Sequence, residues 1–207
     1  MNQEITKRIL SSIIIIVIAF FFITKGSFFY IFFLSVFFFI TGYEWYKMTR
    51  NKNYFIFGLI FLILSFLSAF LLRNIFLNDF ILVILICIST DVGGFVFGKI
   101  FKGPKLTKIS PNKTYSGMIG SFFLSIISAL LYTNYYDLVY WTDSLLLIVV
   151  ILISSISQIG DLTVSYFKRK SNIKNTGKII PGHGGLLDRI DGMLFAIPFA
   201  FILFKFL

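Results

Sequence analysis

The sequence is poor in charged residues. Only 14% of its 207 residues are Asp, Glu, Lys or Arg, against about 25% in an average soluble domain. Hydrophobic residues make up 57% of the chain, 28 residues are Phe, and the mean hydropathy is +0.91. This composition argues against a soluble globular domain, and still more against a disordered chain, because both need a polar surface. It indicates a protein whose surface faces lipid.

Cysteine and histidine are almost absent. The only cysteine, Cys87, lies in an apolar run, so an intrachain disulfide and a thiolate metal site are excluded. We expect Cys87 to be a packing residue. The only histidine is His183, and a typical structural zinc site needs more Cys or His ligands than this chain has.

Long apolar runs occur along the whole chain, which at about 20 residues per span accommodates about seven membrane crossings. Strands are not expected, because an isolated strand in lipid leaves its backbone unpaired and the chain lacks the alternating pattern of a barrel. The predicted fold is all-α, a polytopic integral membrane protein of about seven transmembrane helices. No small-x-small cleavage site follows the first run, so we expect it to be retained. The predicted helices, of which the second is short, span about residues 9–23, 28–43, 55–72, 79–98, 117–133, 144–164 and 186–206.

The distribution of positive charge predicts the orientation. The net charge is +10. With a cytoplasmic N-terminus, 15 Lys and Arg fall in cytoplasmic segments and three in external ones, as the positive-inside rule requires. Two loops, 99–116 and 165–185, hold most of the cytoplasmic charge. Two interpretations of this charge stay open, contact with anionic headgroups and binding of a phosphate-bearing substrate.

The same two loops contain most of the glycine and proline that could shape a site. No internal repeat or linker divides the chain. We therefore predict one structural domain with two parts, N-terminal transmembrane helices at 1–89 and a catalytic transmembrane region with both basic loops at 90–207.

Four carboxylates lie within or at the edge of the predicted spans. They are Asp91, Asp161, Asp188 and Asp191. A charge at membrane depth is costly unless it is paired or hydrated, so such residues indicate a functional site. The alternative is an ion pair that joins two helices. For Asp91, a metal ligand and a buried partner for Lys99 are equal alternatives.

One predicted helix carries a polar stripe. Its members follow one another at i, i+3, i+7 and i+10, and they fall within about 80° of one helix face. They are Gln158, Asp161, Ser165 and Lys168. We expect the stripe to face the protein interior or a water-filled cavity.

The last predicted helix begins with two carboxylates, Asp188 and Asp191, one turn apart. Two such groups repel each other, and a divalent cation removes the repulsion. Hard oxygen ligands favour Mg²⁺ or a similar ion. The glycine-rich segment 181–185 directly precedes this helix, and a helix N-terminus there can approach an anion closely. For His183, a hydrogen bond that fixes the loop and a substrate contact are equal alternatives.

The second basic loop and the start of the last helix resemble a known signature. Its positions here are Ser165, Lys168, Arg169, Lys174, Gly177, Pro181, Gly182, His183, Gly184, Gly185, Leu186, Asp188, Arg189, Ile190 and Asp191. This pattern resembles that of the phosphatidate cytidylyltransferase (CDP-diacylglycerol synthase) family, and the 27 residues from Ser165 to Asp191 make the resemblance specific. Central stretches from Asp91 to Lys99 and from Lys105 to Gly117 are also similar, so the resemblance covers most of residues 90–192.

The resemblance implies a nucleotidyltransferase that joins CTP and phosphatidic acid to give CDP-diacylglycerol and pyrophosphate in phospholipid biosynthesis, with Mg²⁺ as cofactor. It implies metal ligands at Asp161, Asp188 and Asp191. Catalytic residues that neutralise phosphates are expected at Lys168, Arg169 and Arg189. Substrate-binding residues are expected at Ser110, Lys113, Thr114, Ser165, His183, Gly184 and Gly185. Two positions depart from the pattern, since Asn175 replaces the usual aspartate and Ser116 an acidic residue.

Besides the two substrates, the expected partners are membrane lipids and, as an alternative to a monomer, a second copy in a homodimer. Nucleic acid is not among them. The expected location is a bacterial cell (inner) membrane, with the active site facing the cytoplasm.

Other functions fit the sequence less well. An ion-coupled transporter predicts matching polar sets in both halves, and here the polar residues cluster in the second half. A purely structural membrane protein leaves the one-faced polar stripe unexplained. A CDP-alcohol phosphotransferase would carry a longer run of spaced aspartates than this chain contains.

Overall fold

The structure is a computed structural model that describes residues 16–107, 109–138, 140–177 and 184–206. Within these ranges the regular structure is helical, and Lys105 and Thr114 form an isolated antiparallel β-bridge. The prediction of an all-α fold is confirmed. The helices are α2 (Ser27–Thr49), α3 (Phe55–Ile75), α4 (Leu77–Phe101), α5 (Tyr115–Tyr135), α6 (Asp143–Lys170) and α7 (Leu187–Phe206), and a short apolar helix, Ile16–Lys25, precedes them.

Five of these helices, α2 to α6, are long and apolar enough to cross a membrane. Large apolar side chains also cover the outside of the bundle, and Phe57, for example, is 77% exposed. In water such a surface would be unfavourable, whereas in a bilayer it faces lipid. The chain is therefore a polytopic membrane protein. Helix α7 is not among these five because Asp188, Arg189 and Asp191 lie in its first turns.

The second helix is longer than the sequence predicted. We expected it to end near residue 43, but α2 continues to Thr49. The reason is that the polar residue Glu44 does not mark the end of the span. Its side chain points into the protein together with those of Trp45 and Met48, and all three are buried.

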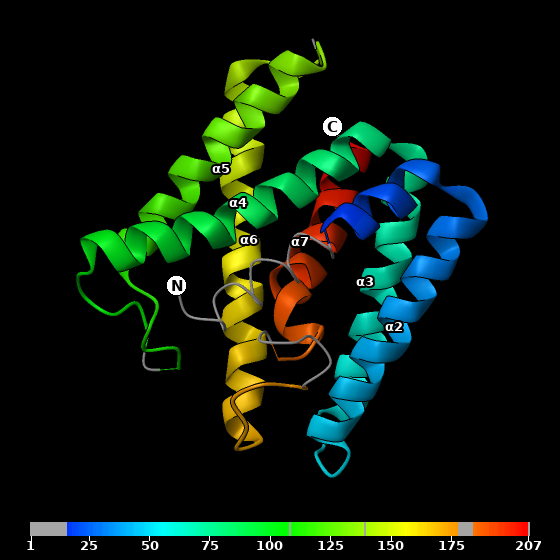
Figure 1. Cartoon of the computed structure of the whole chain (residues 1–207), viewed down its shortest axis with the longest axis vertical. Helices are drawn as coiled ribbons and strands as arrows, with labels where there is room; N and C mark the ends of the chain where they lie inside the picture. Colours follow the sequence, from blue (N-terminus) through cyan, green and yellow to red (C-terminus); the bar gives the residue numbers. More distant parts are fainter. Residues whose placement is uncertain (1–15, 108, 139, 178–183, 207) are drawn as a thin grey trace.

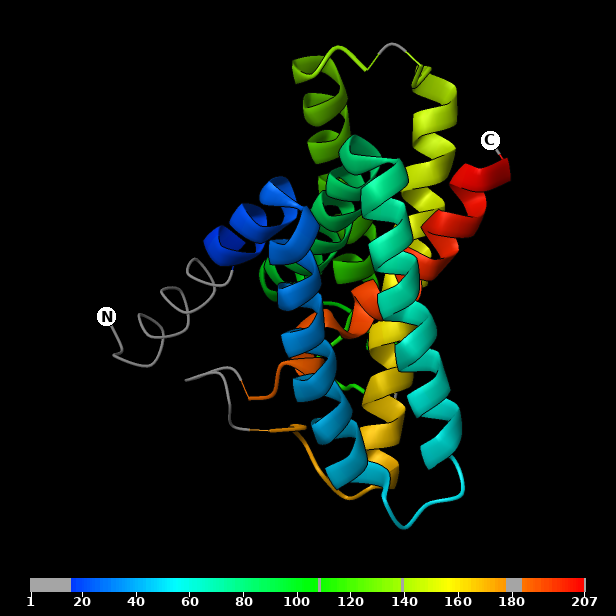
Figure 2. The same ribbon diagram turned by 90° about the vertical axis from the view of Figure 1, so that its right-hand side faces the viewer.

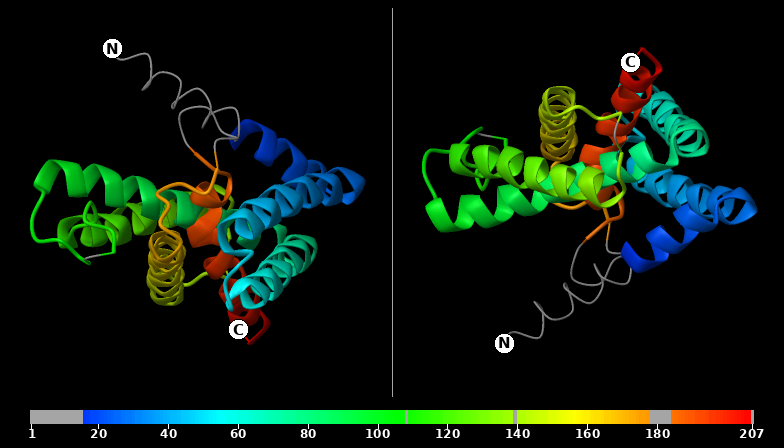
Figure 3. Two further views of the ribbon diagram at one scale, coloured as in Figure 1. Left: turned by 90° about the horizontal axis from the view of Figure 1, so that it is seen from below. Right: turned by 90° about the horizontal axis from the view of Figure 1, so that it is seen from above.

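The helices form two pairs with α6 and α7 between them. Helices α2 and α3 lie side by side, α4 runs obliquely and packs closely against α5, and α6 contacts α7 (Figures 1 and 3). The α4–α5 contact depends on small residues, because a Cβ atom at Gly93 would collide with the backbone of Gly120. Such close backbone approach is typical of helices that associate within membranes.

The main hydrophobic core joins the first half of α6 to its neighbours. Leu146, Val150 and Ile153 of α6 are fully buried against residues of α4 and α7. Cys87 belongs to this core and is buried, so the expectation that it is a packing residue is confirmed. The second half of α6 is different, because there polar side chains replace the apolar ones on the buried face.

The two basic loops lie toward the same end of the molecule. In Figures 1 and 2 the α4–α5 loop and the described parts of the α6–α7 connection lie in the lower half, and the α5–α6 loop lies at the opposite, upper end. The alternation of helix directions thus brings together two segments that are about 60 residues apart in the sequence.

Candidate active site

A buried lysine between two carboxylates forms the centre of the site. Lys168 lies in the last turn of α6, and its Nζ atom is 2.9 Å from Oδ1 of Asp188 and 3.8 Å from Oδ2 of Asp191 on α7. The three side chains are at least nine-tenths buried. Because both carboxylates reach one ammonium group, they share a face of α7, as their spacing predicted.

Asp188 also fixes the chain that precedes α7. Its Oδ2 atom accepts hydrogen bonds from the backbone N–H groups of Thr176, at 2.9 Å, and Gly185, at 3.1 Å. Gly184 has φ +92°, a conformation that glycine adopts readily, and a Cβ there would lie 3.1 Å from Oδ2 of Asp188. Asp188 therefore uses one oxygen for Lys168 and the other for the connection between α6 and α7.

A second ion pair joins the α4–α5 loop to helix α6. Nζ of Lys113, in the α4–α5 loop, is 2.5 Å from Oδ2 of Asp161 on α6. The hydroxyl of Ser165 donates to Oδ1 of the same carboxylate at 3.3 Å. Both side chains of the ion pair are about one quarter exposed, at 26% and 27%. This pair is thus more open than the Lys168 cluster.

The fold of the α4–α5 loop explains where Lys113 lies. The backbone N–H of Leu106 donates to the carbonyl of Lys113 at 2.8 Å, and the N–H of Lys113 donates to the carbonyl of Ser110 at 3.0 Å. Thr114 then caps α5, because its side chain accepts a hydrogen bond from the N–H of Gly117 at 3.1 Å. The loop is closed on both sides of Lys113, and this directs the lysine toward α6.

Asp91 belongs to the same electrostatic cluster. Asp91 lies within electrostatic range of Asp161, Lys113 and Arg189, and Asp161 lies within the same range of Asp191. Lys99, the alternative partner of Asp91, instead lies over the ring of Phe95 at 5.7 Å. Among the ion pairs of the described residues there is none between Asp91 and Lys99. The structure thus does not pair Asp91 with Lys99, and its role as a metal ligand stays a prediction.

The structure also shows a buried carboxylate that sequence reasoning missed. Glu44, in α2, is 1% exposed and binds Thr176, Leu186 and Leu187 at the start of α7. It was missed because it follows the predicted end of an apolar run, where a charged residue is expected to face water. The signal that could have found it is its place three residues after Thr41 and four before Met48, which continues the helical period.

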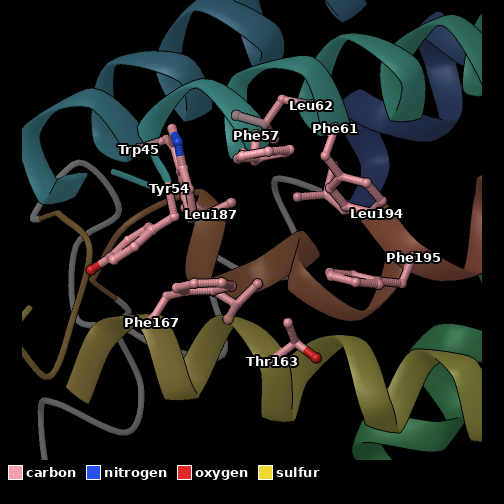
Figure 4. A pocket seen from close by; sticks show the side chains of 12 residues that line it. Trp45, Tyr54, Phe57, Phe61, Leu62, Thr163, Phe167, Leu187, Leu194 and Phe195 are labelled. Atoms are coloured by element: carbon pink, nitrogen blue, oxygen red, sulfur yellow. The ribbon is translucent and has the colours of Figure 1, made fainter. Parts of the chain in front are cut away.

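An apolar pocket lies beside the polar cluster. Its volume is about 240 Å³, and Figure 4 shows aromatic rings from α2, α3, α6 and α7 around it. Phe167 and Leu187 line this pocket, and they are the direct neighbours of Lys168 and Asp188. The two helices therefore present a polar face to the cluster and an adjacent apolar face to the pocket.

Comparison with known proteins agrees with these features. Residues 54–207 match the model of the family described as the cytidylyltransferase family. The chain belongs to the cytidylyltransferase family. Proteins named phosphatidate cytidylyltransferase are among its relatives: that of Rickettsia prowazekii is 40% identical over 167 residues, which are 76% of this chain and 73% of the relative. The protein of that name from Staphylococcus saprophyticus is 38% identical over 143 residues, 68% of this chain and 54% of the relative.

The resemblance drawn from the signature residues is thus confirmed, and the chain is an enzyme of the cytidylyltransferase family. The matched region begins at Tyr54, well before the central stretch near residue 90 from which the sequence resemblance was drawn. It includes α3 and all later helices, and it leaves out α2 with Glu44.

The carboxylates of this cytidylyltransferase have the donor chemistry that Mg²⁺ requires. Among the described residues, no three His, Cys, Asp or Glu side chains lie close enough to complete a metal site alone. Mg²⁺ commonly uses one or two carboxylates together with phosphate oxygens of the substrate, so the oxygen donors of Asp161, Asp188 and Asp191 fit such an ion. Lys168 and Lys113 at present hold the positions beside these carboxylates.

The predicted site residues fall into three groups. The structure brings together Lys113, Asp161, Ser165, Lys168, Gly184, Gly185, Asp188 and Asp191, with Arg189 interacting through Asp91. Ser110 and Thr114 shape the loop of Lys113 through the turn and the helix cap described above. Arg169 lies at the surface, where its Nη1 donates to the carbonyl of Ile173 at 3.1 Å, and its predicted contact with phosphate stays a prediction. His183 lies outside the described residues.

Proposed function

We propose that this enzyme transfers the cytidylyl group of CTP to phosphatidic acid, giving CDP-diacylglycerol and pyrophosphate, with Mg²⁺ as cofactor. The observation that carries the proposal is the cluster in which Lys113 and Lys168 lie beside Asp161, Asp188 and Asp191 at one end of apolar helices. Cations and metal-ligating oxygens at the end of apolar helices suit a reaction between CTP, a soluble polyanion, and the phosphate group of a membrane lipid. The names of the relatives support the choice of substrates.

The chemistry requires positioning and charge neutralisation. A phosphate oxygen of phosphatidic acid attacks the α-phosphorus of CTP and forms the new P–O bond. The bond to the bridging oxygen of the β-phosphate breaks, and pyrophosphate leaves with that electron pair. The attacking phosphate is largely ionised at pH 7, so the reaction needs no general base. A cluster of carboxylates, a hydroxyl and cationic groups suits this requirement.

The two lysines differ in how they can meet phosphate. Lys113 is partly exposed and holds one carboxylate, so its ammonium can turn from Asp161 to an entering phosphate oxygen. Lys168 is buried and would contact phosphate only at the inner end of the cluster. Arg169 and Arg189 are proposed as further cationic groups for the polyanions. When bound, Mg²⁺ would be held by Asp161, Asp188 and Asp191 and would neutralise charge on the departing pyrophosphate.

The lipid substrate explains why the cluster adjoins an apolar pocket. A phosphate group near Lys168 and an acyl chain near Phe167 can belong to one molecule, because these residues are neighbours on α6. The enzyme is an integral protein of the cell membrane. We propose that the end with the two basic loops faces the cytoplasm, where CTP is present, and that the membrane is the inner membrane of a bacterium. A homodimer stays a prediction.

The deciding experiment is an assay of purified enzyme with labelled CTP, Mg²⁺ and phosphatidic acid, run in parallel with other lipid phosphates. We expect CDP-diacylglycerol from phosphatidic acid, its loss when Mg²⁺ is chelated, and a loss of at least about 100-fold in the variant Asp188→Asn. Asp143→Asn is the matched control, because it removes a carboxylate from the other end of α6. Faster turnover of another lipid phosphate would replace the proposed substrate, and unchanged turnover in Asp188→Asn would remove that residue from the site.

A further inference from the structure

Glu44 binds the start of α7 from a helix outside the family signature. Its Oε1 atom accepts a hydrogen bond from the N–H of Leu186 at 2.9 Å, and its Oε2 atom accepts one from the N–H of Leu187 at 2.8 Å. The hydroxyl of Thr176 also donates to Oε2, at 3.0 Å. These partners are more than 130 residues away along the sequence. Three donors and the positive end of α7 thus stabilise one carboxylate that is 1% exposed.

The glycines of the connection leave room for this carboxylate. A Cβ atom at Gly177 would lie 2.6 Å from Oε1 of Glu44, and one at Gly185 would lie 2.6 Å from Oε2. Real Cβ atoms do not approach oxygen so closely, so both positions need glycine while Glu44 is in place. The sequence suggested that the glycine-rich segment 181–185 admits an anionic ligand. In the structure the anion beside Gly185 is a side chain of the protein itself.

Glu44 and Asp188 hold the same segment from two sides. Asp188 accepts hydrogen bonds from the backbone N–H groups of Thr176 and Gly185. Glu44 accepts hydrogen bonds from the hydroxyl of Thr176 and from the backbone N–H groups of Leu186 and Leu187. The N–H groups of residues 185, 186 and 187 are therefore all bound by these two carboxylates. Asp188 in turn reaches Lys168. A continuous series of contacts leads from α2 to the buried lysine.

The end of α2 is itself firmly placed. The next residue, Trp45, donates from its indole Nε1 to the carbonyl of Phe55 at 3.0 Å, and its ring contacts Phe167 of α6 edge-on, with centroids 5.6 Å apart. Glu44 therefore extends from a part of the bundle that is fixed to both α3 and α6. A residue held in this way can transmit a fixed position to its hydrogen-bond partners.

We propose that Glu44 is a positioning residue of this enzyme, which holds the start of α7 so that Asp188 stays against Lys168. The proposal rests on the proposed function, because its effect on turnover is measured with CTP and phosphatidic acid. Glu44 does not touch the reacting groups. It acts through Thr176 and the backbone of residues 185–187.

The first test is Glu44→Gln, which keeps the size of the side chain and replaces one acceptor by an NH₂ group. We expect hydrogen exchange at the amides of Leu186 and Leu187 to become faster, because one of them loses its acceptor and the other keeps only an uncharged one. The exchange of α4 and α5 should stay unchanged. We expect kcat to fall by roughly 10- to 100-fold, with a smaller change in KM for CTP. Unchanged amide exchange overturns the proposal, and so does faster exchange with normal kcat.

A matched pair at Thr176 tests the same contact without changing a charge. Thr176→Val keeps the shape and removes the hydroxyl that binds Glu44, whereas Thr176→Ser retains it. We expect kcat to fall by about fivefold or more in the valine variant and to stay within about twofold of wild type in the serine variant. If Glu44→Gln does not fold, the two Thr176 variants test whether the contact between Glu44 and Thr176 affects turnover. Equal kcat in both variants overturns the proposal. If the wild-type enzyme forms no CDP-diacylglycerol, the proposed function fails, while amide exchange in Glu44→Gln still decides whether Glu44 holds α7.

Discussion

The two ion pairs of the site differ chiefly in burial. Lys168 and its two carboxylates are nearly inaccessible, whereas Lys113 and Asp161 are about one quarter exposed. Removing one partner of a buried pair leaves an uncompensated charge, which is costly, but exposed pairs contribute little to stability. If both lysines act in the proposed reaction, we expect the Lys168 cluster to support the fold as well, and the Lys113 pair to contribute little to stability.

The largest effect is expected from Lys168→Met, because this change leaves Asp188 and Asp191 facing each other without a cation. We expect activity to be lost and the free energy of unfolding to fall by about 3–5 kcal/mol. Thermal unfolding in detergent and the CTP assay measure the two quantities. Lys170→Met is the matched control, because Lys170 lies on the same helix over the ring of Tyr54 and outside the cluster. A stable Lys168→Met protein would contradict the contrast between the pairs.

A smaller effect on stability is expected from Lys113→Met. The free energy of unfolding should change by less than about 1 kcal/mol, because the pair with Asp161 is partly exposed. Activity should still fall by roughly 10- to 100-fold if Lys113 turns toward phosphate. Both variants should lose activity, but only Lys168→Met should lose several kcal/mol of unfolding free energy. If Lys113→Met unfolds as readily as Lys168→Met, burial is not what distinguishes the pairs.

The smallest effect is expected from Asn175→Asp, which restores the aspartate usual in the family. Asn175 is exposed and lies beside Gly184, which is near the carboxylate of Asp188, so the change adds an acidic oxygen at the rim of the cluster. We expect the Mg²⁺ concentration for half-maximal activity to fall by about two- to tenfold, with little change at saturating Mg²⁺. A titration of activity against Mg²⁺ measures this shift. Loss of activity at every Mg²⁺ concentration would mean that an additional carboxylate near Asp188 prevents the reaction.

Much of the fold could be predicted from the sequence, because apolar runs and helical periodicity are local signals. The ranges predicted for α3, α4 and α5 lie within three residues of the observed ends. The polar stripe of α6 and the shared face of Asp188 and Asp191 also followed from spacing alone. These features depend on neighbours in the sequence and not on the packing of distant segments.

The contacts between distant segments could not be predicted. Nothing in the spacing of residues couples Lys113 to Asp161, because that distance depends on how α4 and α5 pack against α6. The role of Glu44 was hidden for the same reason, since its three partners all lie in the second half of the chain. The helical period of α2 can indicate that Glu44 is buried, but it does not indicate that the partner is the start of α7.

The close packing of α4 on α5 has a consequence for how the enzyme tolerates change. Gly120 packs against Gly93. It lies six residues after Thr114, which caps α5 and directly follows Lys113. A methyl group added at either glycine would separate α4 from α5. This would move Lys113 away from the carboxylate of Asp161. A substitution at Gly93 or Gly120 is therefore expected to disturb the Lys113–Asp161 pair, although neither glycine belongs to that pair.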